Sequence, residues 1–428
     1  MHGPHSVSFS SGENVPSTDQ QCDVAIIGAG IVGLAVGLNL IQRIPGIKLL
    51  VLDKEKEVAA HQTGHNSGVI HSGLYYKPGS LKARLCVEGA AALVRFCREF
   101  GIPHEVCGKL VVATEEDEIP ALMELLRRGQ ANGLTGLREL NGSEIREVEP
   151  YCAGVRGLHV ASTGITDFKL VAQKYAELIE KAGGGILFNH AVEGIACEAG
   201  GVILETPSGT VRTRFAINCA GLHSDRIARM AGARLGLRII PFRGEYYMVA
   251  PARHHLVKAL IYPVPDPHFP FLGVHFTRRI AGGVEAGPNA VFSFRREGYA
   301  RSSFSARDTL SAAMFPGFWK MAALYWKSGL AEMYRSWSKR AFAAAARELV
   351  PSLEKNDLEP GGSGVRAQAL DSSGRLLDDF YFIYHDRVLH VCNVPSPAAT
   401  ASLVIGREIV SKLAENADLR RVQVAMKQ

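Results

Sequence analysis

The chain has 428 residues, of which 47% are hydrophobic and 21% charged, as in an ordinary globular protein of one or two domains. A net charge of +6 is modest for this length, so we expect no nucleic-acid partner. The eight cysteines form no C-x-x-C pair, which argues against a disulfide framework and a zinc site and favours a reducing compartment.

The first structured segment is predicted to begin at Asp23, after a polar tail at 1–21 that we expect to be disordered. This tail lacks the apolar segment of a signal peptide, and no apolar run in the chain approaches the roughly 18–20 residues of a membrane span. Val24–Ile27 is predicted to be a buried strand, Leu34–Arg43 a helix and Lys48–Leu52 a second strand.

Between the first strand and the helix lies the turn Gly28-Ala29-Gly30-Ile31-Val32-Gly33, and Asp53 ends the second strand. Such a unit binds dinucleotides: Gly28 permits the tight turn, Gly30 lets a pyrophosphate approach and Gly33 lets the helix pack closely on the strand. The helix N-terminus attracts phosphate, and the Asp53 carboxylate accepts hydrogen bonds from a ribose. The context of the glycines therefore predicts a dinucleotide site.

The middle of the chain alternates loops, helices and strands. The segment 61–78 has no periodicity and is predicted to be a loop, and Asp167 is predicted to cap a helix that ends at the glycines 183–185. The turn Pro207-Ser208-Gly209 predicts a hairpin between 202–205 and 211–219. The other predicted elements are helices at 80–100 and 115–132 and strands at 108–114 and 186–195.

All three tryptophans lie in a predicted helix within 315–342, where Trp319, Trp326, Leu330, Met333 and Trp337 form one stripe. Lys320 and Lys327 flank the stripe, within a segment (295–347) that has seven more basic than acidic residues. We favour a helix packed on its own domain, because aromatic stripes are usually core. The alternative is a peripheral contact with an anionic membrane.

The chain closes with a predicted strand at 388–392, a turn at 393–397 and a helix at 398–413. A helix N-terminus at 398–400 could stabilise negative charge on the pyrimidine edge of a reduced flavin. This second strand–turn–helix and the 61–78 loop, where an NAD enzyme would continue its strand–helix alternation, favour FAD over NAD.

Several long strings are similar to the L-2-hydroxyglutarate dehydrogenase/oxidase family, which belongs to the glycine/D-amino-acid-oxidase-like flavoproteins. The likeness spans roughly 22–413, with Asp53 where Glu is common in the family and Val394 where Ala is usual. The strings are His61-Gln62-Thr63-Gly64-His65-Asn66-Ser67-Gly68-Val69-Ile70-His71-Ser72-Gly73, Tyr75-Tyr76-Lys77-Pro78, Pro241-Phe242-Arg243-Gly244-Glu245-Tyr246, Ile261-Tyr262-Pro263-Val264-Pro265-Asp266, Phe269-Pro270-Phe271-Leu272-Gly273-Val274-His275, Gly287-Pro288-Asn289-Ala290-Val291, Arg296-Glu297-Gly298-Tyr299, Gly364-Val365-Arg366-Ala367-Gln368-Ala369 and Asn393-Val394-Pro395-Ser396-Pro397-Ala398-Ala399-Thr400.

This resemblance implies an FAD enzyme that oxidises L-2-hydroxyglutarate, a small dicarboxylate, to 2-oxoglutarate and passes electrons to a quinone or, less efficiently, to oxygen. The location implied is the bacterial cytoplasm, with peripheral contact to the inner membrane, or alternatively the mitochondrion. The implied fold is α/β (α+β): a Rossmann-like FAD-binding domain (22–80, 165–225 and 355–420) with an interleaved antiparallel-sheet substrate domain (81–164 and 226–354). The predicted FAD-binding residues are Gly28, Ala29, Gly30, Ile31, Val32, Gly33, Asp53, Lys54, Gln62, Thr63, Ser67, Gly68, Val69, Val192, Gly221, Pro397, Ala398, Ala399 and Thr400.

Oxidation of a 2-hydroxy acid needs a hydride acceptor, a base for the hydroxyl proton and cations for the carboxylates. His71 is the proposed base, with His61, His65 and His275 as rivals. Arg366 is the first choice for the carboxylate clamp, because a guanidinium matches a carboxylate with two hydrogen bonds. The second-tier site residues are Arg243, Tyr246, Tyr76 and His275. We expect no metal, because Gly64 and Gly68 make the 61–68 segment a loop rather than a helix.

Two other functions stay open on the sequence. One is a related flavin oxidase for an amine, an amino acid or glycerol 3-phosphate, since phosphate and carboxylate both attract arginine. The other is a flavin-binding protein without turnover, which acts as a redox-sensing or assembly module. Reduction of the flavin by a hydroxy acid would separate all three.

Overall fold

The computed structural model describes residues 19–266 and 272–416. Strand β1 (Gln20–Ile27) begins three residues before the predicted start at Asp23, so the last two residues of the predicted tail belong to a strand. Residues 1–18 of that tail, the Phe269-Pro270-Phe271 string and the end of the predicted FAD-binding domain beyond 416 lie outside the described residues.

The first sheet has a core of five parallel strands in the order β9-β2-β1-β12-β20. The predicted hairpin is present, because β11 pairs antiparallel with β12. The strands are β1, β2 (Leu49–Leu52), β9 (Gly185–Leu187), β10 (Gly194–Glu198), β11 (Gly201–Thr206), β12 (Gly209–Asn218), β19 (Tyr381–His385) and β20 (Val388–Asn393). A parallel sheet of this kind requires cover on both faces, which explains the unbroken apolar runs.

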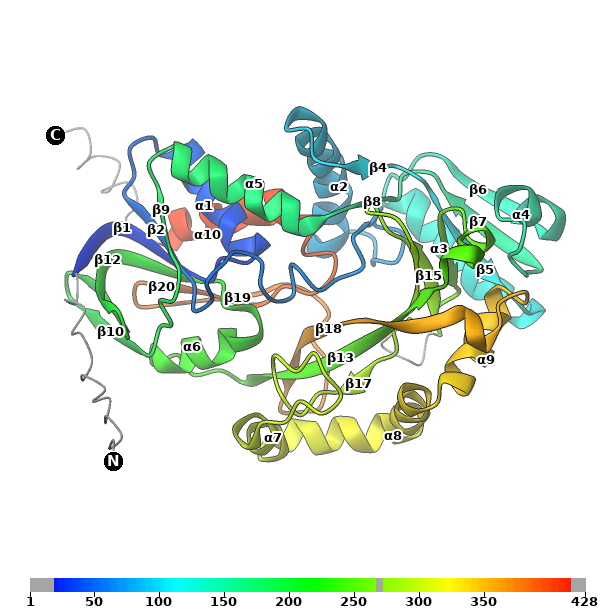
Figure 1. Cartoon of the computed structure of the whole chain (residues 1–428). Helices are drawn as coiled ribbons and strands as arrows, with labels where there is room; N and C mark the ends of the chain where they lie inside the picture. Colours follow the sequence, from blue (N-terminus) through cyan, green and yellow to red (C-terminus); the bar gives the residue numbers. More distant parts are fainter. Residues whose placement is uncertain (1–18, 267–271, 417–428) are drawn as a thin grey trace, which may run out of the picture.

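Alternation along β1 separates the two faces of this sheet. Val24 and Ile26 join a core shared with four helices, whereas Ala25 and Ile27 join a core shared with β11 and the helix α6 (Ser224–Met230). The four helices are α1 (Ile31–Arg43), α2 (Leu81–Glu99), α5 (Phe168–Lys181) and α10 (Ser402–Asn416), and α1, α5 and α10 lie together over the sheet in Figure 1. The Asp167 side chain caps α5, as predicted.

A second, nine-stranded sheet runs in the order β17-β13-β16-β15-β14-β5-β7-β6, and β18 pairs with β13 along most of its length. Most of its pairs are antiparallel, and β14 with β5 is the parallel exception. The strands are β5 (Lys109–Ala113), β6 (Leu137–Asn141), β7 (Arg156–Val160), β13 (Leu237–Val249), β14 (Leu260–Pro263), β15 (His275–Arg278), β16 (Val284–Gly287), β17 (Val291–Phe292) and β18 (Leu358–Asp371).

The remaining elements surround the second sheet or join it to the first. A small sheet links the two, in the order β3-β8-β4. The strands of this small sheet are β3 (Val69–Ile70), β4 (His104–Glu105) and β8 (Gly164–Thr166). The remaining helices are α3 (Ile119–Ala131), α4 (Gly142–Val148), α7 (Ala306–Ala313), α8 (Pro316–Trp337) and α9 (Lys339–Leu349). The 3₁₀ turns are η1 (Glu116–Glu118), η2 (Gly221–His223), η3 (Pro251–Leu256) and η4 (Lys355–Asp357).

The fold class predicted from the sequence is confirmed: a Rossmann-like sheet is interleaved with a largely antiparallel second sheet. Two predicted boundaries need correction. The helix α2, placed in the substrate domain, packs in the core of the first sheet, and β18, placed in the FAD-binding domain, pairs with β13 of the second sheet. The predicted strand at 186–195 is also wrong, because the chain turns at Asn189 (φ +58°) between β9 and β10.

The tryptophan stripe is not core, contrary to the interpretation favoured from the sequence. Trp319 is 61% exposed and Trp337 75% exposed, and Trp326, Leu330 and Met333 are exposed as well. The helix α8 ends at Trp337, and non-helical backbone at Tyr325 kinks it. In the described part of the chain, no helix combines the length and the apolar character that crossing a membrane requires.

Candidate active site

The glycine turn lies between β1 and α1, and two of its glycines are required by the protein's own packing. Gly28 has φ +112°, and a Cβ there would lie 2.5 Å from the carbonyl oxygen of Cys219. At Gly33 a Cβ would lie 2.0 Å from the carbonyl oxygen of Gly28. Both distances are too short for any side chain, so these two glycines hold helix and strand together.

Gly30 is different, because a Cβ there would meet only Thr63 Oγ1, at an ordinary 3.6 Å. Gly30 is also the N-cap of α1 and provides no side-chain cap, while the N–H of Ile31 donates to Thr63 Oγ1 at 3.0 Å. Internal packing therefore does not explain this glycine. Open space in front of a helix N-terminus is what a pyrophosphate needs, so the turn fits a dinucleotide cofactor.

Asp53 braces the turn from the end of β2. Its carboxylate oxygens accept hydrogen bonds from the N–H groups of Ala29, at 2.6 Å, and Glu55, at 2.9 Å. Each oxygen keeps a second acceptor position, and the residue faces the cavity. Asp53 can therefore hold the turn in shape and still accept hydrogen bonds from a ribose.

A cavity of about 1210 Å³ extends from this turn to the second sheet. It exceeds the roughly 300–1,000 Å³ of a typical small-molecule site, so it has room for a dinucleotide and a small substrate. Ala29, Gly33, Gly68 and Arg243 are not among its lining residues. The predicted site residues that line it are Gly28, Gly30, Ile31, Val32, Asp53, Lys54, Gln62, Thr63, Ser67, Val69, His71, Tyr76, Val192, Gly221, Tyr246, His275, Arg366, Pro397, Ala398, Ala399 and Thr400.

The turn before α10 contributes backbone donors to the cavity. The helix begins at Ser402, four residues later than predicted, and residues 397–401 form turns. Within 19–266 and 272–416, the N–H groups of Ala399 and Thr400 donate to no acceptor. Two unpaired donors beside a helix N-terminus suit the electron-rich pyrimidine edge of a reduced flavin.

His71 lies where this turn meets the 61–78 loop. Its backbone N–H donates to Thr400 Oγ1 at 3.1 Å, and Thr400 Oγ1 donates in turn to the Val69 carbonyl. The imidazole faces the cavity and makes no hydrogen bond to another described residue. Burial, reinforced by the charges of Lys109 and Arg366, lowers the pKa of His71 to about 3. The ring is therefore neutral at physiological pH, the form in which it accepts a proton.

His275, on β15, is the second imidazole in the same cavity. Its Nδ1 lies 2.8 Å from the Gly273 carbonyl oxygen, so Nδ1 carries the hydrogen and Nε2 carries the lone pair. Burial lowers the pKa of this ring to about 3 as well. Its plane packs against the ring of Tyr262, with the centroids 4.1 Å apart. Unlike His71, it has an orientation fixed by its own hydrogen bond.

Arg366, on β18, brings positive charge to this end of the cavity. Its charge lowers the pKa of both His71 and His275, so the guanidinium lies close to both rings. Tyr246 and Tyr76 line the same region, and burial raises the pKa of both phenols, which keeps them protonated as hydrogen-bond donors. One arginine, two neutral imidazoles and two phenols therefore surround a single volume.

Arg243 does not belong to this group, although it was predicted as a second clamp. It is only 6% exposed, and its guanidinium donates to Glu245 Oε1, at 2.8 and 3.0 Å, and to the Ala300 carbonyl. Glu245 lies two residues further along the same strand, so both side chains point to one face. Arg243 stabilises the second sheet and is not available to a substrate.

Lys109 was missed in the sequence, because it only begins an apolar strand. Lys109 is only 1% exposed, and its Nζ lies 4.3 Å from the ring centre of Tyr75 and 5.0 Å from that of Tyr262. Burial lowers its pKa to about 7, and its charge in turn lowers the pKa of His71 and His275. Lys109 thus stands behind two cavity-lining tyrosines and adds to the positive potential of the site.

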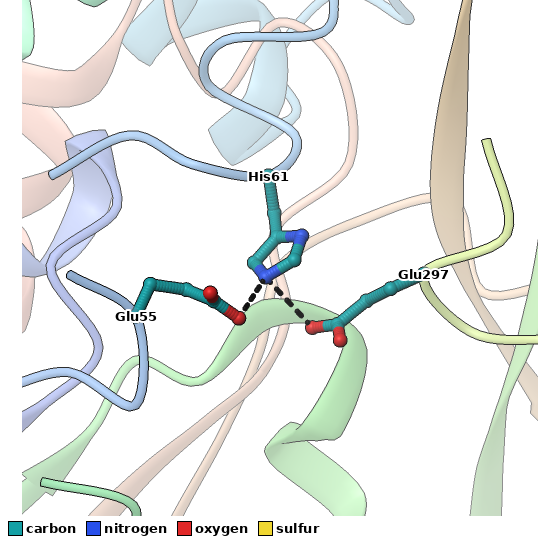
Figure 2. A group of neighbouring side chains, drawn as sticks. All are labelled: Glu55, His61 and Glu297. Carbon is teal, nitrogen blue, oxygen red and sulfur yellow. Dashed lines mark hydrogen bonds and ion pairs between the residues drawn. The ribbon is translucent and has the colours of Figure 1, made fainter. Parts of the chain in front are cut away.

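A separate cluster joins the two sheets over the nucleotide end of the cavity. Glu55, His61 and Glu297 offer ligand atoms within 4.8 Å of one another, a spacing that suits a metal (Figure 2). The Lys54 ammonium already lies among them, 3.0 Å from His61 Nε2, 2.9 Å from Glu297 Oε2 and in contact with Glu55. Although burial raises the pKa of Glu297, its basic neighbours lower it to about 2. The cluster is an ion-pair network, and His61 belongs to it.

Comparisons with known proteins agree with this geometry. The family described as FAD dependent oxidoreductase matches the chain over residues 23–412. The L-2-hydroxyglutarate dehydrogenase of Indibacter alkaliphilus is 55% identical over 384 residues, which cover 90% of this chain and 96% of that protein. The mitochondrial L-2-hydroxyglutarate dehydrogenase of Homo sapiens is 43% identical over 440 residues, which cover 97% of this chain and 95% of that protein.

Solved structures share the fold at lower identity. The L-alpha-glycerophosphate oxidase of Mycoplasma pneumoniae, solved with FAD bound, superposes with a TM-score of 0.76 at 23% identity over 92% of this chain and 95% of that one. Glycine oxidase from Geobacillus kaustophilus superposes with a TM-score of 0.70 at 19% identity over the same shares. At these identities the likeness supports the fold alone.

Proposed function

Since the chain belongs to the L-2-hydroxyglutarate dehydrogenase family of FAD dependent oxidoreductases, we propose that it oxidises L-2-hydroxyglutarate to 2-oxoglutarate. The observation that carries this proposal is the placement of Arg366 with two neutral histidines in the cavity that begins at the glycine turn. The proposed FAD site consists of the turn around Gly30, Asp53 and the backbone at 398–400.

FAD, when bound, supplies the hydride acceptor at its N5 atom. The protein's part is to hold the hydroxy acid and remove the hydroxyl proton. We assign the carboxylate to the Arg366 guanidinium and the proton to the neutral imidazole of His71, with Tyr246 and Tyr76 as hydrogen-bond donors. His71 is the better base candidate, because its ring has no hydrogen-bond partner among the described residues and so can turn toward a substrate.

The proposed substrate is tested by reduction of the bound flavin without oxygen. L-2-Hydroxyglutarate is expected to bleach the yellow absorbance of the bound flavin completely, whereas D-2-hydroxyglutarate, glycine and glycerol 3-phosphate leave it yellow. Bleaching by glycine or glycerol 3-phosphate instead would assign the protein to a different flavin oxidase reaction. Flavin that none of these compounds reduces would favour a binding protein without turnover.

Arg366→Met is expected to raise KM for L-2-hydroxyglutarate and to lower kcat/KM by about 10–100-fold, the worth of a hydrogen bond to a charged group. Flavin content should stay normal, because Arg366 is on β18 and away from the glycine turn. Arg375→Met is the matched control, since this arginine follows the same strand but is exposed and pairs with Asp371. Steady-state kinetics on both variants check the assignment, and an unchanged KM in Arg366→Met removes that residue from the clamp.

The electron acceptor that we propose is a membrane quinone, with oxygen as the slower alternative. The proposed location is the cytoplasmic face of a bacterial inner membrane, and the mitochondrion is the alternative, since relatives from animals are named mitochondrial. Parallel turnover assays with a soluble quinone and with dissolved oxygen distinguish the two acceptors.

A further inference from the structure

Large exposed hydrophobic side chains gather on one segment of the molecule. Of the sixteen such residues in the described chain, eleven lie between Phe294 and Trp337. Such a concentration of exposed apolar side chains on one segment is uncommon on a protein that has no partner for it. We define the tryptophan surface as the ten of them on and beside α7 and α8: Phe304, Leu310, Met314, Trp319, Leu324, Trp326, Leu330, Met333, Tyr334 and Trp337.

The exposed residues of the tryptophan stripe lie together on one side of α8. Projected at about 100° per residue, the buried residues Gly317, Met321, Glu332 and Ser336 fall on one side of the helix. The stripe of Trp319, Trp326, Leu330, Met333 and Trp337 falls on the other side. In Figure 1, α7 and α8 run along the outer edge of the molecule, below β13 and β17. The helix thus packs with one side and presents an apolar stripe with the other.

The exposed charges of α7 and α8 have one sign. Arg307, Lys320 and Lys327 are exposed on these two helices, while α9 adds the exposed Arg340, Arg347 and Glu348. The acids of α7 and α8, Asp308 and Glu332, are both buried: Asp308 pairs with Arg226, and Glu332 with Arg335 and the Ala290 N–H. The apolar stripe is therefore bordered by cations without a neighbouring exposed acid from these two helices.

We propose that the tryptophan surface is a peripheral membrane-docking face, which inserts its aromatic stripe among the headgroups of an anionic phospholipid bilayer. Tryptophan prefers the membrane–water interface, and lysines beside it attract anionic lipid. A second copy of the chain is less favoured, because a symmetric pair would bring two like-charged surfaces together. The proposal deepens the proposed function, since it rests on a quinone held in the membrane as the electron acceptor.

The strands β13 and β18 contact both the helices of the tryptophan surface and the cavity. Ile240 and Phe242 of β13 and Leu370 of β18 pack against Phe315, Phe318 and Met321 of the α7–α8 region. Tyr246 and Arg366, on the same strands, line the cavity. β13 and β18 therefore contribute residues both to the packing of α8 and to the lining of the cavity.

Tryptophan fluorescence tests the proposal directly, because all three tryptophans of the chain lie on this surface. Vesicles of phosphatidylcholine with about one third phosphatidylglycerol are expected to shift the emission of the holoenzyme to shorter wavelength. Vesicles with brominated acyl chains are expected to quench it, and pure phosphatidylcholine vesicles to act more weakly. Unchanged emission with every vesicle, at low and at high salt, overturns the proposal.

Sedimentation of variants with the same vesicles separates the contribution of the lysines from that of the tryptophans. Lys320→Gln with Lys327→Gln is expected to weaken binding by on the order of tenfold and to reduce its salt dependence. Trp319→Ser, Trp326→Ser and Trp337→Ser together should abolish binding, whereas Leu170→Ser, an exposed leucine on α5, should not change it. L-2-Hydroxyglutarate oxidation with a soluble dye should be equal in all of them.

These outcomes keep the two proposals distinct. Loss of vesicle binding with normal dye-linked oxidation is the expected result for the tryptophan variants. A wild-type enzyme that oxidises the hydroxy acid but ignores all vesicles refutes only the docking face. A wild-type dimer in analytical ultracentrifugation that the tryptophan variants break, without vesicle binding, assigns the surface to a second copy and also refutes it.

Discussion

His71→Asn is expected to lower the rate of anaerobic flavin reduction by about 10²–10⁴-fold, the usual contribution of a positioned general base. The imidazole is neutral at physiological pH and faces the cavity beside Arg366, so its removal deletes the acceptor for the hydroxyl proton. FAD content should remain normal, because the backbone N–H of His71, not its ring, bonds to Thr400. Stopped-flow absorbance of the purified holoenzyme measures both quantities.

His275→Asn is the matched comparison, because it removes the second imidazole of the same cavity. Its ring is fixed by the Gly273 carbonyl, so we expect a smaller loss of rate and a larger loss of thermal stability. The reverse ranking, with His71→Asn near the wild-type rate, would transfer the role of base to His275. Since both histidines have a pKa of about 3 in the free enzyme, kcat/KM should show no histidine titration between about pH 5 and pH 8.

Gly30→Val is expected to yield a folded protein without FAD and with activity reduced by more than about 10²-fold. A Cβ at this position meets only Thr63 Oγ1 at 3.6 Å, so the fold tolerates it, but the valine methyl groups occupy the space that the pyrophosphate needs. The ratio of flavin to protein absorbance, with the circular dichroism spectrum as the test of folding, checks this result.

Gly200→Val controls for the loss of a glycine as such, because a Cβ there meets nothing within 4 Å and the residue lies in the turn between β10 and β11. It should retain full flavin. Normal flavin content in Gly30→Val would disprove the assignment of the phosphates to this turn. An unfolded Gly30→Val protein would contradict the packing argument. The smaller change Gly30→Ala tests the same argument, because it adds only the Cβ that meets Thr63 Oγ1 at 3.6 Å.

The nucleotide end of the site could be predicted from the sequence because it is local. A buried strand, a glycine turn and a helix follow one another within β1 and α1, and the acid that completes the unit ends the next strand. The hairpin of β11 and β12 was predictable for the same reason. Long strings around His71 and Arg366 identified the family, and the structure brings both residues to one cavity.

Other features depend on contacts that a linear pattern does not contain. Periodicity located the aromatic stripe of α8 but does not say which side of a helix packs, and the structure exposes the stripe. Lys109 reads as an ordinary lysine before an apolar strand, although two distant tyrosines enclose it. Arg243 was different: Glu245, two residues away on a strand, was a visible signal that its charge has a partner.

The architecture of the first sheet has a consequence for how the enzyme is made. β1 begins at Gln20, near the start of the chain, whereas β20, which pairs with the neighbouring strand β12, lies near its end. The late helix α10 packs closely on α1, since a Cβ at Gly406 would lie 2.6 Å from the Ala35 carbonyl oxygen. A ribosome therefore exposes the glycine corner hundreds of residues before the partners that shelter it. We therefore expect flavin to bind only after nearly the whole chain has been synthesised, when β20 and α10 can complete the first sheet.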